Sequence, residues 1–242
     1  MRSIDEAAVR TSEARREAFG QATAAFTALV ARVGSEDWQL PALGQWTVRD
    51  LVGHASRALS TIEAYLPTAA QPAPVVQGTR ARQAGRPTDP VLDADAYELA
   101  GPADYYLAAR ASLGDPAAVA ERGRVAGRAL GADPAGAVCT LATRVLALVA
   151  ATADNTLIRS PVGTMAFVDY LPTRTFELTV HGLDLARALP GDSGPGAGAP
   201  LGSALAAGLD LAAELAARGP DAADLLLLLT GRGSLRTGLS AL

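Results

Sequence analysis

Apolar side chains recur at steps of three and four residues along most of this chain, which is the spacing of one face of an α-helix. The clearest case is the series Phe19, Thr23, Phe26, Val30 and Val33. Aromatic residues make up 5% of the chain, and alanine and leucine dominate it, which favours helices over strands. The sequence therefore predicts a mainly all-α fold.

Capping residues mark where several of these helices begin. Thr47 stands before an apolar-periodic stretch, and Asp50 occupies the third helical position, as in a capping box. Asp115-Pro116 and Asp133-Pro134 each combine an N-cap aspartate with proline at the first helical position. The helix that begins at Asp133-Pro134 is almost continuously apolar to about Asp154, so we expect it to be the most buried one.

Glycine and proline divide the chain into two unequal parts. Residues 191–200 consist largely of these two residue types and are typical of a linker. The sequence before them predicts four substantial helices that form a bundle over residues 1–190, with extra helices between them, the last running from about 172 to 189. Residues 201–242 are then a short C-terminal helical appendage.

Two stretches in the middle of the chain are less regular. Residues 68–91 are rich in proline, glutamine, glycine and arginine and predict a long irregular loop. Its Arg82 is a candidate for binding a substrate carboxylate, and a plain solvated loop is the alternative. Helical signals resume over residues 94–99, and residues 156–167 have extended character, as a connector or a small hairpin.

The charge and the composition exclude several classes of function. A net charge of −4 and a pI near 5.2 argue against a general nucleic-acid-binding protein. The chain has no lysine, which excludes Schiff-base chemistry and a phosphate-loop lysine. Its single cysteine, Cys139, excludes an internal disulfide and is expected to be an inert core residue.

The sequence also bears on the cellular location of the protein. The longest apolar run, residues 145–153, is shorter than the ~20 residues that cross a bilayer, and no apolar signal region opens the chain. We therefore expect a soluble, cytoplasmic protein without membrane attachment. The exclusive use of arginine as the basic residue, with abundant alanine, glycine and proline, suggests an actinobacterial source.

Glu177, His181 and His54 are the candidate metal ligands. Glu177 and His181 are four residues apart, so in a helix they lie on one face about one turn from each other. His54, the only other histidine, shares the apolar face of the helix capped by Thr47. A divalent cation would compensate a buried Glu177 carboxylate. A hydrogen-bonded pair of Glu177 with His181, and a simple core histidine at position 54, are the alternatives.

These motifs together resemble the mycothiol-dependent maleylpyruvate isomerase family, which belongs to the DinB-like four-helix-bundle superfamily of metal-binding proteins. The resemblance rests on Trp46-Thr-Val-Arg-Asp-Leu-Val-Gly-His54, on Glu177-x-x-x-His181 and on the continuation Gly-Leu-Asp184, and it covers roughly residues 10–190. It implies that His54, Glu177 and His181 bind zinc. Fuller members of the family have a larger C-terminal domain that contributes an active-site arginine, for which Arg232 is the candidate in this shorter chain.

The resemblance also implies the chemistry. Two imidazoles and one carboxylate leave a coordination position open on zinc, as in catalytic sites. We expect mycothiol to be activated there as a thiolate and added to a small electrophile by an S-transferase. A mycothiol-dependent cis–trans isomerase of the maleylpyruvate type is the main alternative, and a zinc hydrolase or a non-catalytic binding protein are the others. A monomer or a homodimer is expected.

Three more residues are expected near the site. Asp184 lies one turn beyond His181 and is placed to orient its imidazole. Asp50 is a weaker candidate for the same role, because its carboxylate also completes the Thr47 cap. Arg174 lies one turn before Glu177, where it would neutralise that carboxylate, bind substrate or point into solvent.

Overall fold

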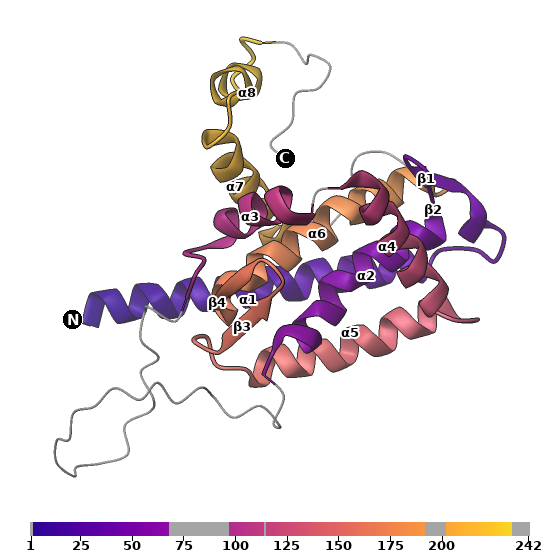
Figure 1. Cartoon of the computed structure of the whole chain (residues 1–242), viewed down its shortest axis with the longest axis horizontal. Coiled ribbons are helices and arrows are strands. Elements are labelled where there is room, and N and C mark those ends of the chain that lie inside the picture. Colours follow the sequence, from indigo (N-terminus) through magenta and orange to yellow (C-terminus); the bar gives the residue numbers. More distant parts are fainter. Residues whose placement is uncertain (1, 68–96, 114, 192–201, 234–242) are drawn as a thin grey trace.

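The computed structural model describes residues 2–67, 97–113, 115–191 and 202–233 (Figure 1). Within these ranges the chain is mostly helical, which confirms the predicted all-α class. The helices are α1 (Arg2–Val30), α2 (Val48–Tyr65), α3 (Pro102–Leu113), α4 (Pro116–Ala129), α5 (Pro134–Ala151), α6 (Phe167–Ala188), α7 (Ser203–Ala217) and α8 (Ala222–Leu229). Two short antiparallel hairpins complete them, β1 (Pro41–Leu43) with β2 (Trp46–Thr47) and β3 (Leu157–Ser160) with β4 (Gly163–Ala166).

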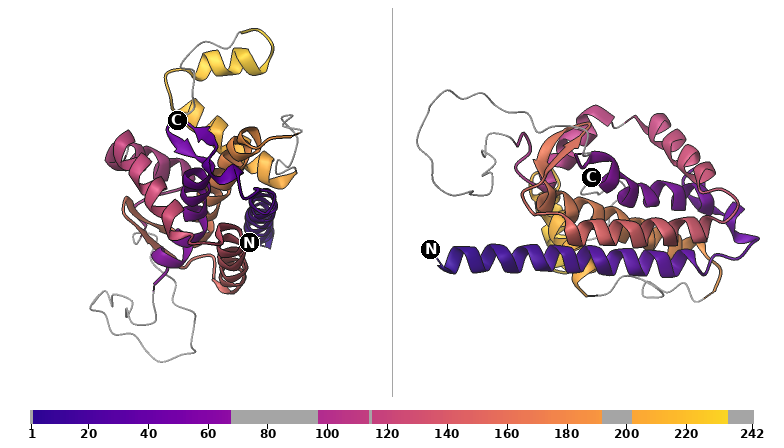
Figure 2. Two further views of the ribbon diagram at one scale, coloured as in Figure 1. Left: turned by 90° about the vertical axis from the view of Figure 1, so that its right-hand side faces the viewer. Right: turned by 90° about the horizontal axis from the view of Figure 1, so that it is seen from below.

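Four of these helices form the predicted bundle. The helices α1 and α2 each pack against both α5 and α6, and Figure 2 shows α1 running alongside α5. Large side chains from three of them meet in the fully buried centre, among them Phe19, Phe26, Leu59, Tyr170 and Leu178. Burial of this apolar surface is the main force that holds the bundle together.

The start of α2 is fixed by the capping box that the sequence predicted. The backbone N–H of Asp50 donates to Oγ1 of Thr47 at 3.2 Å, and the backbone N–H of Thr47 donates to Oδ2 of Asp50 at 3.2 Å. Such a cap stabilises a helix by about 1 kcal/mol. It also sets the register of α2, which places His54 two turns later on the side that packs against α6.

The helix α6 begins earlier than expected. Its first backbone N–H groups, those of Phe167 and Val168, donate to the carbonyls of Thr156 and Asp154, so the base of the β3–β4 hairpin replaces a side-chain cap. Pro172 therefore lies inside the helix, whereas the sequence had suggested that the helix begins there. The hairpin agrees with the extended character predicted for residues 156–167.

The prediction of a helix over residues 94–99 is wrong for residues 97–99, the part that the structure describes. Tyr97, Glu98 and Leu99 are not helical, and the backbone N–H groups of Glu98 and Leu99 both donate to the carbonyl of Thr164. Pairing with β4 thus satisfies backbone groups that a helix would have used.

The prediction that α5 is the most buried helix is also wrong. Only one face of it is buried, through Val138, Ala142, Val145 and Val149. Cys139 lies on the opposite, exposed face, so it is not the core residue that its apolar neighbours suggested. By length and composition α5 could cross a membrane, with a mean hydropathy of 1.6 over 18 residues of which 28% are buried, but one such helix is weak evidence for a span.

The two last helices differ in how they pack. The helix α7 lies against α1 and α6, and its Leu211 and Leu215 are buried with Ala103 and Phe176. The helix α8 follows α7 and contacts it (Figure 1). It has no buried residue and exposes several leucines. Nearly all of the predicted 191–200 linker and the whole 68–91 loop, including Arg82, lie outside the described residues. The division into residues 1–190, 191–200 and 201–242 therefore stays a prediction.

Candidate metal centre

The fold brings His54, Glu177 and His181 together between α2 and α6. One ligand atom from each of these side chains lies within 4.8 Å of the other two, in an arrangement able to hold a metal ion. The imidazole rings of His54 and His181 meet edge to face, with their centroids 5.0 Å apart. The candidate ligands that the sequence singled out thus share one site, although they come from helices more than 100 residues apart.

His181 is held between two carboxylates. Its Nε2 lies 3.3 Å from Oε2 of Glu177, and its Nδ1 lies 3.2 Å from Oδ2 of Asp184. Burial alone would lower the pKa of His181, but the hydrogen bonds and charges of Asp184 and Glu177 outweigh burial and raise the pKa to about 9. Asp184 therefore lies where the sequence expected it, next to the ring nitrogen that faces away from Glu177.

Glu177 is a half-buried carboxylate with several partners. The Tyr106 hydroxyl, from α3, lies 2.7 Å from Oε1 of Glu177 and 3.0 Å from the carbonyl of Thr173. Burial raises the pKa of Glu177, yet His181, the charge of Arg174 and the Tyr106 hydroxyl together lower it to about 2. The carboxylate is therefore ionised at neutral pH.

His54 differs from His181 in its charge. Burial first, and then the charge of His181, lower the pKa of His54 to about 4, so this imidazole is neutral at pH 7. Its Nδ1 is buried and has no hydrogen-bond partner among the described residues. The Trp46 ring lies 4.5 Å from the His54 ring, and Nε1 of Trp46 donates to the carbonyl of Ala120 in α4, which holds the indole in place.

These observations fit a divalent metal. Imidazole nitrogen and carboxylate oxygen are common zinc ligands, and three protein ligands are the usual number in a catalytic zinc site. A neutral imidazole such as His54 is the form that binds metals, and a buried nitrogen without a partner is costly unless something binds it. His181 is already oriented by a carboxylate on its second nitrogen, as in many zinc sites.

Arg174 is buried rather than on the surface. Its guanidinium lies against two rings, with Cζ 4.7 Å from the centroid of Tyr170 and 5.1 Å from that of Tyr105. Nε of Arg174 donates to the Thr173 hydroxyl at 3.0 Å. The residue is only 6% exposed, and its charge lowers the pKa of the nearby Glu177. The solvent-facing position considered from the sequence is therefore wrong, and neutralisation of Glu177 fits better.

The other predicted residues lie elsewhere or serve other contacts. The carboxylate of Asp50 is engaged by the Thr47 cap at the start of α2. Arg232 is exposed after α8, bonds the carbonyl of Thr230, and follows a helix that Figure 1 shows projecting away from α2 and the bundle. Tyr106 was missed, because a tyrosine about 70 residues before its partner Glu177 gives no signal in sequence spacing.

The comparison with known protein families agrees with this geometry. A family profile described as the mycothiol maleylpyruvate isomerase N-terminal domain matches residues 19–186, which include all three candidate ligands. Neither a curated protein nor a solved structure matches the chain.

Proposed function

Because the chain belongs to the family of the mycothiol maleylpyruvate isomerase N-terminal domain, we propose that it is a zinc-dependent enzyme that adds mycothiol to a small electrophile. The convergence of His54, Glu177 and His181 within 4.8 Å carries this proposal. In the proposed enzyme these three side chains hold the metal. A divalent metal bound there would supply positive charge, which lowers the pKa of a thiol bound beside it.

The chain's own residues prepare this site. Nδ1–H of His181 donates a hydrogen bond to Oδ2 of Asp184, which leaves Nε2 directed toward Glu177. Tyr106 holds one oxygen of the Glu177 carboxylate, so that the other is turned toward His181. Cys139, the single cysteine, lies on α5, whereas the candidate ligands lie on α2 and α6, so in the proposed reaction the thiol comes from a cosubstrate.

In the transferase reaction a carbon–sulfur bond forms as the thiolate attacks an electrophilic double bond. The π electrons move to the neighbouring carbon, which takes up a proton, and the thioether is released. The family is named after an isomerase, which favours a second candidate, a cis–trans isomerase. There the adduct rotates about the former double bond before protonation, and expulsion of the thiolate restores the double bond in the trans form.

Metal analysis of the purified protein tests the ligand set. We expect about one zinc per chain, and a large loss of zinc in His54→Ala, Glu177→Gln and His181→Ala. Glu13→Gln, at an exposed position of α1, is the control and is expected to keep its zinc. A wild-type protein with little metal, and the same content in His181→Ala, would rule the proposal out.

Calorimetry then tests whether mycothiol binds and whether its binding depends on the metal. Mycothiol is expected to bind the zinc-loaded protein and to bind poorly after the metal is removed by a chelator. Turnover of a cis-configured electrophile separates the two candidates, because the transferase accumulates the thioether, whereas the isomerase yields the trans product without consuming the thiol.

A further inference from the structure

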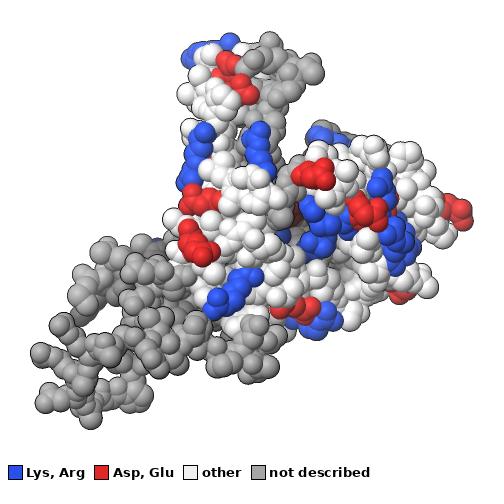
Figure 3. Space-filling view, in the orientation of Figure 1, with Lys and Arg blue, Asp and Glu red and all other residues white. Residues whose placement is uncertain are grey.

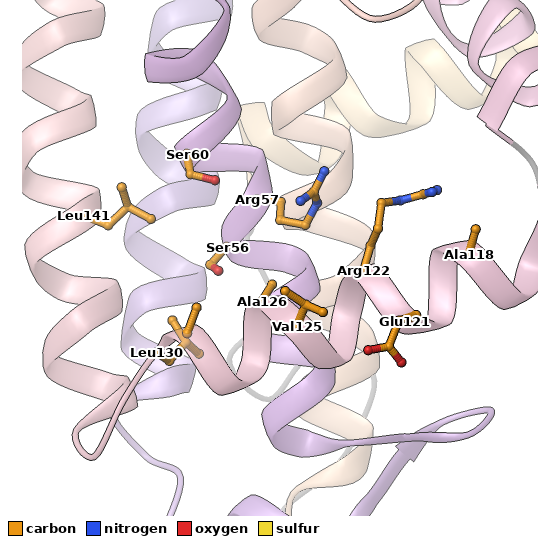
Figure 4. A pocket seen from close by; sticks show the side chains of 11 residues that line it. Ser56, Arg57, Ser60, Ala118, Glu121, Arg122, Val125, Ala126, Leu130 and Leu141 are labelled. Atoms are coloured by element: carbon orange, nitrogen blue, oxygen red, sulfur yellow. The ribbon is translucent and has the colours of Figure 1, made fainter.

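A cavity of about 630 Å³ lies between α2, α4 and α5 (Figure 4), and none of the three candidate metal ligands lines it. Two of its lining side chains are cationic, Arg57 from α2 and Arg122 from α4. Ser56 and Ser60 add hydroxyl groups from α2. The remaining wall is largely apolar and includes Val125, Ala126, Leu130 and Leu141.

Arg57 connects this cavity with the metal centre. It stands three residues after His54 on α2, so the two side chains are neighbours on the helix surface. Arg57 is half-buried, and no carboxylate of the described residues forms an ion pair with it. The one acidic residue in the cavity wall, Glu121, instead pairs with Arg124 and Arg128.

Positive charge accumulates on this side of the centre. Arg57 and Arg122 line the same cavity from α2 and α4, two helices that pack against each other. The same two arginines and the buried Arg174 act together on Tyr65, whose pKa burial raises and their charges lower. Figure 4 shows Arg57 and Arg122 extending in one direction from α2 and α4, and Figure 3 shows arginines gathered over the α4 side of the molecule.

We propose that this cavity binds the carboxylate of an anionic electrophile, with Arg57 and Arg122 as its ligands and the electrophilic carbon directed toward the metal centre. Guanidinium groups match carboxylates in shape and charge and bind them with two parallel hydrogen bonds. An apolar wall with a few polar groups suits the carbon skeleton of a small organic acid. The assignment to the electrophile rests on the function proposed above.

Binding of maleate, a small dicarboxylate with an electrophilic double bond, tests the site by calorimetry. Its neutral diamide, maleamide, is the matched ligand without charge. We expect maleate to bind both the zinc-loaded and the metal-free protein, and maleamide to bind at least about tenfold more weakly, as charge-assisted hydrogen bonds would require. Using metal-free protein separates binding by the arginines from direct coordination of maleate to zinc.

The variants Arg57→Gln and Arg122→Gln are each expected to weaken maleate binding by about tenfold or more, with little effect on maleamide. Arg57→Lys is expected to recover part of the loss. Arg32→Gln, which removes an exposed arginine just after α1, changes the net charge equally and is expected to bind maleate as the wild type does. Circular dichroism checks that each variant is folded.

Unchanged maleate affinity in folded Arg57→Gln and Arg122→Gln would overturn the proposal, as would equal affinity for maleate and maleamide. Weaker mycothiol binding in these variants, with maleate unaffected, would assign the cavity to the thiol and overturn it too. Zinc content and mycothiol binding are measured on the same preparations. A protein that holds no zinc and binds no mycothiol would contradict the proposed function. Arginine-dependent binding of maleate to the metal-free protein would still support the proposed carboxylate site.

Discussion

Glu177 shows how much a single candidate metal ligand depends on the side chains around it. Its carboxylate is half-buried, and a carboxylate shielded from water is destabilised unless hydrogen bonds or a counter-charge compensate it. Tyr106 supplies the hydrogen bond on one oxygen, His181 faces the other, and Arg174 adds a positive charge nearby. A change in any of these three alters the carboxylate that the proposed metal would meet.

The variant Tyr106→Phe tests the most specific of these contacts. It removes the hydroxyl 2.7 Å from Oε1 of Glu177 and leaves the ring in place. Because partners of this kind typically contribute 10- to 100-fold to metal affinity, we expect a loss of about that size in a zinc competition titration. Tyr97→Phe is the control, since the Tyr97 hydroxyl donates to the carbonyl of Asn155 outside the site. Equal zinc affinity in both variants would show that Tyr106 does not position the ligand.

The two histidines give the metal-free protein a stability maximum near pH 6.5. The folded-state pKa of His54 is about 4, below its ordinary 6.5, so the unfolded chain binds more protons between these values and stability falls as the pH drops from 6.5 to 4. The pKa of His181 is about 9, so its stabilising protonation is complete below pH 6.5 and is lost as the pH rises to 9.

Urea unfolding of chelator-treated protein across this range measures the effect. Each histidine is expected to contribute a slope of up to about 1.4 kcal/mol per pH unit. His181→Gln is expected to flatten the alkaline side of the profile and His54→Gln the acidic side. A wild-type profile that is flat between pH 6.5 and 9 would contradict the tight pairing of His181 with Glu177 and Asp184.

Residue spacing predicts which side chains are neighbours on one helix, but it does not predict contacts between helices. Glu177, His181 and Asp184 lie on one helix, where spacing determines which side chains are neighbours, and the sequence placed them correctly relative to one another. Tyr106 and the burial of Arg174 depend on how α3 packs against α6. No local pattern carries that information.

Among the elements, the contact between α2 and α4 constrains the site most tightly. A Cβ atom on Gly53 would lie 2.1 Å from the backbone nitrogen of Gly127, so the two helices touch backbone to backbone. Gly53 immediately precedes His54, and α4 carries both Arg122 and the carbonyl that binds Trp46. The close crossing therefore sets the position of the proposed carboxylate site relative to the metal centre.

The variant Gly53→Ala is expected to push α4 away and to destabilise the protein by about 1–3 kcal/mol, the usual cost of overpacking. Gly20→Ala is the matched control, because Gly20 lies inside α1 and a Cβ there would meet no atom within 4 Å. That change is expected to stabilise the helix by about 0.5–1 kcal/mol. Thermal unfolding measures both, and equal effects of the two substitutions would contradict the close helix crossing.

The helices themselves were predictable where their ends are determined locally. The caps at Thr47, Asp115 and Asp133 are all present as the sequence indicated. The start of α6 and the backbone of Glu98 were not predictable, because their hydrogen bonds go to the β3–β4 hairpin. The apolar composition of α5 was misleading for a different reason, since composition does not reveal which apolar face is covered by another helix.

For the whole molecule, the packing of α7 links the C-terminal region to the metal centre. Leu211 and Leu215 are buried against Phe176, the residue that precedes Glu177 on α6. In contrast, α8 buries no residue and exposes Leu226 and Leu229 by 64% and 76%. The two helices that follow the predicted linker are therefore expected to contribute very differently to stability.

Two shortened chains test this difference. A chain that ends at residue 218 loses α8 and is expected to unfold at the same urea concentration as the full chain. A chain that ends at residue 190 also loses α7 and exposes Ala103 and Phe176, so we expect it to be less stable by about 3 kcal/mol or more, from the lost burial of two leucines. Its zinc affinity is expected to fall as well, because Phe176 supports the turn of α6 that carries Glu177. If both shortened chains matched the full protein, residues 1–190 would form an independent unit and α7 would be dispensable for the site.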